Sequence, residues 1–263
     1  MRRKTMMKSL IPLLLLASAV AGVVDIQKRV LNASPCPDDK GEHYVVLMQP
    51  VHDVAFCGGN LINQEWVLTA EHCNIGAFRV VLGRHTSEKE IVMRFIDTDE
   101  GKYFFEDDNK HRHDIMLLKL PNKPSVKLPI INVPDIGCTS PDALPEHNPY
   151  TIIGWSYTAT DSSGQKNKDK PDKLQCGDIP LHSGCTGRNK DLHAVDREYV
   201  KEHMICSKSV LHCETCKGDS GGSLVKGDIL YGVTVAGTEV PSGFSYFMDV
   251  CAYRKWIKDT AKF

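Results

Sequence analysis

The sequence predicts an all-β fold, a barrel or a sandwich, with one helix at its C-terminal end. Two observations support this expectation. Short segments rich in β-branched and aromatic residues recur along the chain between clusters of turn-forming residues, which does not suit alternating βαβ units. Only the last residues show helical periodicity, because Ala252, Trp256, Ile257 and Ala261 fall on one face after Cys251.

The strand prediction covers eight short segments. The predicted strands are residues 44–48, 66–69, 78–82, 91–96, 115–118, 150–153, 229–236 and 244–250. No internal repeat is present. Residues 165–173 are rich in lysine and aspartate, and such a charge run is typical of an exposed loop.

The N-terminal residues predict export. A basic lead at residues 2–8 precedes an apolar run at residues 10–16, and Ala19-Val20-Ala21 offers a cleavage site. This order is typical of a secretory signal, here residues 1–21, and the apolar run is too short to span a bilayer. A buried N-terminal helix is the alternative. We therefore expect a secreted, extracellular protein.

Charge and cysteine content narrow the functional classes. The formal net charge is −1, so nothing favours nucleic acid or an anionic membrane as a partner. Ten cysteines in an exported chain indicate a disulfide framework. The only CxxC, Cys213 to Cys216, has no second pair at zinc-site spacing, so no metal site is predicted.

A glycine-rich segment near the C-terminal end contains a candidate nucleophile. Ser220 lies in residues 216–224, with glycines close on both sides. A serine hydroxyl is a poor nucleophile until a base removes its proton. Its tetrahedral intermediate also needs backbone N–H donors, and glycine lets the backbone turn to aim them. Gly218 and Ser220 bracket such an oxyanion hole.

A base and an acid are available upstream. His72 lies in residues 68–73 and Asp114 in residues 113–119, each at the end of a predicted strand. A barrel can present side chains at such positions in a cleft. The order His72, Asp114, Ser220 is one of the known orders of the Ser-His-Asp triad. The chain has no HExxH motif and no Gly-x-Ser-x-Gly elbow between a strand and a helix, so the competing hydrolase chemistries lack support.

These three motifs together resemble those of the trypsin/chymotrypsin family of serine proteases, and the resemblance runs from Val30 to the end of the chain. It implies a chymotrypsin-like all-β fold of two six-stranded antiparallel β-barrels with a C-terminal helix. The peptidase domain would be residues 30–263, with the catalytic cleft between the barrels. By the same resemblance His72 is the general base, Asp114 orients it and Ser220 is the nucleophile.

The family also implies activation by cleavage. Residues 22–29 form a short polar segment that ends in a dibasic pair, and cleavage after Arg29 would free the Val30 ammonium to fold onto Asp219. Residues 31–33 lack the two glycines usual at this point, which stiffens a segment that must bend. Asn32 begins the only glycosylation sequon in the chain, and an unmodified Asn32 is the alternative.

The resemblance implies a set of disulfides as well. The implied pairs are Cys57 with Cys73, Cys36 with Cys176, Cys138 with Cys251, and Cys185 with Cys206. Cys213 and Cys216 depart from the pattern, since the usual partner of Cys216 would fall in residues 237–242, which contain no cysteine. A local Cys213–Cys216 bridge or two free thiols are both open.

Substrate preference depends on the primary pocket. Glu214 lies six residues before Ser220, at the position that forms the pocket floor in this family, while Gly237 and Ser245 leave the walls open. A carboxylate there suits an Arg or Lys side chain. In the alternative, the altered cysteines displace the loop and leave Glu214 in solvent. Arg84 stands where calcium-binding members have a Glu, so no cofactor or metal is expected.

Three departures lie near the triad. Val235 replaces a Ser that usually supports the catalytic Asp, Glu71 replaces a small residue before the His, and Ala236 replaces a Trp of the cleft wall. We expect a serine endopeptidase that acts as a monomer on protein or peptide substrates. Its other partners would be an activating protease and protein protease inhibitors. The alternative is a protease-like binding or regulatory protein with little turnover.

Overall fold

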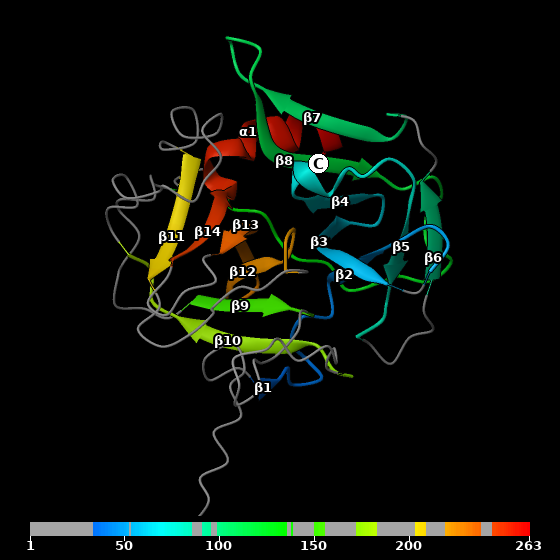
Figure 1. Ribbon diagram of the computed structural model, residues 1–263, viewed down its shortest axis with the longest axis horizontal. Helices are drawn as coiled ribbons and strands as arrows, with labels where there is room; N and C mark the ends of the chain where they lie inside the picture. Colours follow the sequence, from blue (N-terminus) through cyan, green and yellow to red (C-terminus); the bar gives the residue numbers. More distant parts are fainter. Residues whose placement is uncertain are drawn as a thin grey trace, which may run out of the picture.

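The computed structural model describes the strands, the helices and most of the turns between them. The described residues are 34–52, 54–85, 91–95, 99–135, 138, 150–155, 172–182, 203–208, 219–237 and 244–263, without the side chains of residues 94 and 208. They form two antiparallel seven-stranded sheets that lie side by side, with the helix α1 at one edge of the pair (Figure 1).

The N-terminal half of the chain forms the first sheet, in the order β6-β5-β2-β3-β4-β8-β7. Its strands are β2 (Tyr44–Met48), β3 (Ala55–Asn63), β4 (Trp66–Thr69), β5 (Phe78–Leu82), β6 (Ile91–Phe95), β7 (Lys102–Glu106) and β8 (Arg112–Lys119). A short 3₁₀ helix, η1 (Glu71–Cys73), follows β4 directly.

The C-terminal half forms the second sheet, in the order β1-β10-β9-β12-β13-β14-β11. Its strands are β1 (Ser34–Pro35), β9 (Tyr150–Gly154), β10 (Gln175–Ile179), β11 (Met204–Lys208), β12 (Ser223–Lys226), β13 (Ile229–Gly237) and β14 (Phe244–Asp249). The N-terminal strand β1 therefore joins the sheet of the other half, where Ser34 pairs with Cys176.

The observed architecture confirms the all-β prediction of two antiparallel bodies and a C-terminal helix. Each sheet has one strand more than the six we expected, because β7 pairs with β8 and the two-residue β1 pairs with β10. The eight predicted strands correspond to β2, β4, β5, β6, β8, β9, β13 and β14. The prediction missed β1, β3, β7, β10, β11 and β12, most of which carry glycine, cysteine or charged residues in place of β-branched ones.

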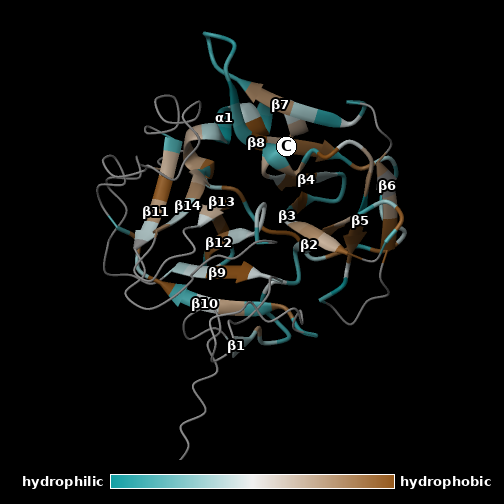
Figure 2. Cartoon of the chain, viewed as in Figure 1, coloured by the Kyte–Doolittle hydropathy of each residue, from teal (hydrophilic) through white to brown (hydrophobic). Residues whose placement is uncertain are grey.

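Both sheets contribute to one apolar core. Leu68 and Leu117 of the first sheet and Val233 and Met248 of the second belong to it and are fully buried. The strands of both sheets carry hydrophobic segments, whereas the turn between β7 and β8 is hydrophilic (Figure 2). A shared core fixes the two sheets relative to each other, and this is what a site built from both sheets requires.

The helix α1 (Val250–Ala261) continues directly from β14. Asp249 caps its N-terminus, since its side chain accepts from the Cys251 amide at 3.0 Å, and burial raises the pKa of Asp249 to about 7. The predicted helix is confirmed. Of the residues predicted to share one face, Ile257 and Ala261 are buried and Trp256 is partly buried. Tyr253 is buried and Ala252 is exposed, because Tyr253 packs against Phe105 of β7 with ring centroids 4.9 Å apart.

The structure contains three disulfides that the family resemblance implied. They join Cys36 to Cys176, Cys57 to Cys73, and Cys138 to Cys251. Cys206 is also disulfide-bonded, and its expected partner Cys185 lies outside the described residues. No helix in the described part of the chain is long and apolar enough to cross a bilayer.

Candidate active site

His72 and Asp114 form the first part of the site. His72 lies in η1, immediately after β4, and Asp114 lies in β8, which pairs with β4. The Asp114 carboxylate accepts from the His72 backbone amide at 2.9 Å and contacts its Nδ1 at 2.7 Å. With Nδ1 as the donor in this contact, Nε2 is the ring nitrogen left to take up a proton.

Ser220 lies on a tight turn before β12 that both sheets hold in place. The Ser220 carbonyl accepts from the Gly58 amide of β3 at 2.7 Å, and the Gly221 amide donates to the Thr234 carbonyl of β13 at 2.7 Å. The Thr234 amide in turn donates to the Gly222 carbonyl at 3.0 Å. The turn that carries Ser220 is therefore fixed by main-chain hydrogen bonds from the first sheet and the second.

Gly221 makes this close approach possible. Its φ is +80°, and a Cβ atom there would lie 2.2 Å from the Gly58 carbonyl oxygen and 2.3 Å from Thr69 Oγ1. Thr69 Oγ1 in turn donates to the Gly58 carbonyl at 2.7 Å. Only glycine fits both the backbone conformation and the space at this position.

A disulfide connects the base to the anchor of the nucleophile. Cys73 follows His72 and is bonded to Cys57, whose neighbour Gly58 holds the Ser220 carbonyl.

The predicted residues His72, Asp114 and Ser220 thus share one region where the two sheets meet. Thr69 and Gly58 also support it, and sequence reasoning did not single them out. The glycine pair after Cys57 was the available signal for a close backbone contact.

Asp219, the residue before Ser220, is a buried carboxylate with an exposed fraction of 4 %. It packs against Gly154 of β9, where a Cβ atom would lie 2.1 Å from Asp219 Oδ1. Burial first, and then the charge of Asp219, raise the pKa of the nearby Tyr44 hydroxyl. The segment that was expected to supply its cationic partner, Val30, lies outside the described residues.

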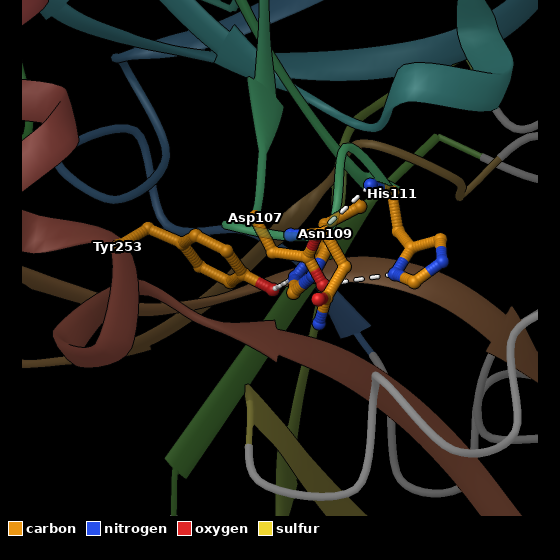
Figure 3. A network of polar contacts seen from close by, with 5 residues as sticks. Asp107, Asn109, His111 and Tyr253 are labelled. Atoms are coloured by element: carbon orange, nitrogen blue, oxygen red, sulfur yellow. Dashed lines mark hydrogen bonds and ion pairs between the residues drawn. The ribbon is translucent and has the colours of Figure 1, made fainter.

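A second polar cluster adjoins Asp114 and was not anticipated. Asp107 Oδ1 accepts from the backbone amides of Asn109 and His111 at 2.9 and 2.8 Å, which closes the turn between β7 and β8 (Figure 3). His113, next to Asp114, is 3 % exposed and contacts Tyr253 Oη through Nδ1 at 2.6 Å. Burial, with the neighbouring His203, lowers the pKa of His113. These contacts fix the start of the strand that carries Asp114.

Glu71, which we expected to add negative charge beside His72, lies near a cation. Arg112 Nη1 is 3.9 Å from Glu71 Oε1, and Arg112 Nε donates to Glu106 Oε1 at 3.2 Å. The Arg112 guanidinium also lies 4.2 Å from the centre of the Phe104 ring. The charge that Glu71 brings to the site is therefore partly offset by Arg112.

Two of the residues expected to form the primary pocket lie side by side. Gly237 of β13 pairs with Ser245 of β14; Gly237 is exposed and Ser245 is 1 % exposed. The irregularity in this pairing falls between Thr234 and Ala236, at Val235. The remaining expected site residues lie outside the described residues, namely Arg29, Val30, Asn32, Cys185, Cys213, Glu214, Cys216 and Gly218.

In the described part of the chain, the one group of side chains spaced like metal ligands is Cys57, His72 and Cys73. Cys57 and Cys73 form a disulfide, so their sulfur atoms are not thiolates and do not act as ligands. The contact of His72 with Asp114 suits proton transfer.

Comparisons with known proteins agree with this geometry. The sequence model of the Trypsin family matches residues 32–257. Human Kallikrein-8 is 32% identical over 260 residues, covering 94% of this chain and 92% of the relative. Human Serine protease 1 is 32% identical over 260 residues, covering 97% and 98%. The solved structure of mouse neuropsin, a serine protease, superimposes with a TM-score of 0.64 at 25% identity and covers 88% of this chain and 99% of that one.

The chain belongs to the trypsin family of serine proteases. It is a serine-type endopeptidase with the chymotrypsin-like fold.

Proposed function

We propose that the protein is a secreted endopeptidase, made as an inactive precursor, that cleaves peptide bonds after Arg or Lys through His72, Asp114 and Ser220. The observation that carries this proposal is the pair of contacts between Asp114 and His72, at 2.9 and 2.7 Å. It gives the base a defined orientation, and the anchored turn fixes the backbone of the candidate nucleophile Ser220.

In this mechanism Ser220 Oγ attacks the carbonyl carbon of the substrate while His72 Nε2 takes its proton. The negative charge on the carbonyl oxygen is stabilised by the backbone amides of Gly218 and Ser220. His72 then donates its proton to the leaving amine, which leaves an ester on Ser220. A water molecule then attacks this ester while His72 takes its proton. His72 returns the proton to Ser220 Oγ, and the carboxylic acid product is released. Asp114 stays ionised and stabilises the imidazolium that forms twice in each cycle.

Maturation would take place in two cleavages. The first removes residues 1–21 on export, and the second cuts after Arg29, so that residues 30–263 form the peptidase domain. The new Val30 ammonium then pairs with Asp219. The burial of Asp219, with an exposed fraction of 4 %, supports this step, since pairing with an ammonium stabilises a buried carboxylate. Asn32, three residues after the cut, is a candidate for glycosylation.

The preference for Arg or Lys rests on Glu214. A basic side chain that passes along the wall formed by Gly237 and Ser245 would meet its carboxylate and gain a charge-assisted hydrogen bond. The pairing of Gly237 with Ser245 on adjacent strands supports this location of the pocket wall. The substrates would be proteins or peptides, and a separate protease would perform the activating cut. Protein inhibitors would be further partners of a monomeric enzyme.

A fluorophosphonate probe tests the proposed nucleophile. The purified chain, cleaved after Arg29, should be labelled at Ser220 and should hydrolyse peptides. Ser220→Ala should remove labelling and lower turnover on the order of 10⁶-fold. The matched control is Ser125→Ala, which changes an exposed serine in the connection between the sheets and should leave labelling intact.

Peptide cleavage by Ser220→Ala at a near-normal rate would overturn the assignment. A chain that is correctly folded and cleaved but remains unlabelled would instead favour a protease-like binding protein.

A further inference from the structure

A cavity of about 220 Å³ lies away from the triad, and none of the three triad residues lines it. It is formed by the segment before β2, the connection between the two sheets, β9, and the turn between β12 and β13. Ile130, Ile131 and Ile153 give it apolar walls, whereas Asp39, Glu42 and Asp228 place three carboxylates around it. Lys40 is the one cationic residue among its lining residues.

A buried histidine forms part of the cavity wall. His43 is 7 % exposed, and burial lowers its pKa to about 4, so its ring is neutral at physiological pH. One of its ring nitrogens, Nε2, lies 3.1 Å from Ser223 Oγ. The other, Nδ1, has no hydrogen-bond partner in the described part of the protein.

Neighbouring hydrogen bonds determine which nitrogen carries the proton. Asn60 Nδ2 donates to two backbone carbonyls, of Leu68 at 3.2 Å and Gly221 at 3.0 Å, so the orientation of the Asn60 amide is fixed. Its Oδ1 therefore accepts the Ser223 hydroxyl proton at 2.5 Å. Ser223 has no second proton to give, so its contact with His43 is one in which Nε2–H donates. Nδ1 is consequently a bare acceptor.

The cavity thus combines three features that select a ligand. The acceptor Nδ1 of the largely buried His43 can take an N–H or O–H donor from a ligand. The excess of carboxylates over ammonium groups favours a cation. The apolar walls favour a hydrocarbon body, and a cavity of about 220 Å³ holds a ring or a branched alkyl group but not a drug-sized molecule.

We propose that this cavity is a binding site for a small organic ammonium ion, whose N–H group donates to His43 Nδ1 while its charge is balanced by the carboxylates around the cavity. The hydrocarbon part of the ligand packs against the isoleucines. This site is separate from the primary pocket and does not depend on catalysis.

Calorimetric titration with cyclohexylammonium tests the proposal on the Ser220→Ala chain, so that turnover plays no part. Asp228→Asn removes one carboxylate on an exposed turn and should weaken binding by about tenfold, the value of one charge-assisted contact. Asp259→Asn is the matched control, because Asp259 is an exposed aspartate of α1 outside the cavity, and it should leave the affinity unchanged.

A second ligand tests the histidine. N,N,N-trimethylcyclohexylammonium keeps the charge and the ring but has no N–H donor, so it should bind at least tenfold more weakly to the unaltered cavity. Equal affinity for the two ligands would overturn the role of His43 Nδ1. An affinity that does not change in Asp228→Asn, or one that is lost in Glu214→Gln, would place the cation in the primary pocket and overturn the site.

Discussion

Individual side chains in this protein are constrained by neighbours that belong to distant parts of the sequence. His43, Ser223 and Asn60 form one hydrogen-bonded chain that starts before β2, passes through β12 and ends in β3. Asn60 also donates to the carbonyl of Gly221, the residue after Ser220. One buried polar chain therefore extends from the ammonium-binding cavity to the turn of the nucleophile.

The protonation of His43 makes stability depend on pH. Unfolded histidine takes up a proton near pH 6.5, but His43 in the folded protein does so only at about 4, because burial disfavours its charged form. The unfolded state therefore binds more protons between these values, and stability falls as the pH falls. Replacing His43 with Gln should remove this effect, so wild type should lose about 3 kcal/mol relative to His43→Gln between pH 7 and pH 4.

Urea denaturation of both proteins at a series of pH values measures this difference. Asp249, whose folded-state pKa of about 7 is raised by burial, changes stability in the opposite direction over part of this range. Its contribution is common to both proteins and cancels in the subtraction. Parallel curves for the two proteins would show that His43 is not held neutral by the fold.

The sequence was most informative about which side chains could carry out the chemistry. The segments around His72, Asp114 and Ser220 identified a base, an acid and a nucleophile because each role needs a particular side chain. Asn60 and Thr69 could not be identified in this way. Their importance depends on which backbone carbonyl lies opposite them in space, and a single sequence does not contain that distance.

At the scale of elements, α1 contacts the first sheet through its aromatic side chains. The Tyr253 hydroxyl lies 2.6 Å from His113 Nδ1 of β8, and its ring packs against Phe105 of β7. Trp256 adds an edge contact to Phe105 at 5.7 Å. The helix thus packs against the strand that carries Asp114.

Tyr253→Phe should lower the free energy of unfolding by about 1–3 kcal/mol, because it leaves the buried His113 Nδ1 without its partner while keeping the ring. Tyr231→Phe is the matched control. Tyr231 is a partly buried tyrosine of β13 whose ring packs against Tyr150, and its loss of a hydroxyl should change stability by less than about 0.5 kcal/mol. Thermal or chemical denaturation of both variants provides the measurement, and equal effects would contradict the role of the Tyr253 hydroxyl.

The sequence predicted this helix but not its contacts. Helical periodicity placed Ala252 and Trp256 on one face with other apolar residues, whereas the structure buries Tyr253 and leaves Ala252 exposed. Tyrosine carries a hydroxyl that hydropathy counts as polar, yet here that hydroxyl has a buried partner. Strands rich in β-branched and aromatic residues were likewise found, whereas β3 was missed, because its two glycines serve close packing and not β-propensity.

At the scale of the whole molecule, two disulfides differ in how much chain they enclose. Cys36 and Cys176 are 140 residues apart, and Cys57 and Cys73 are 16 apart. The arrangement into two sheets followed from the family resemblance, since short strands alone allowed one barrel, a sandwich or two bodies. Neither the pattern of short strands nor the stated resemblance was used to predict the order of the strands within each sheet.

Replacing Cys36 and Cys176 with Ser should lower the free energy of unfolding by about 5 kcal/mol, against about 3 kcal/mol for the same change at Cys57 and Cys73. The chain-entropy model gives this order because the longer loop restricts the unfolded chain more. Guanidinium denaturation under oxidising conditions measures both losses. An equal or reversed order would mean that local packing, and not loop closure, determines the stabilisation.

The contact of Tyr253 with His113 also has a consequence for the order in which a growing polypeptide can fold. The side chain that covers His113 in the first sheet is Tyr253 of α1, which lies 140 residues further along the sequence. While the ribosome still encloses that helix, the first sheet can form its strands but not its finished surface beside Asp114. The region of the catalytic carboxylate is therefore complete only after α1 has been synthesised and has packed on the first sheet, however early the strands of that sheet form.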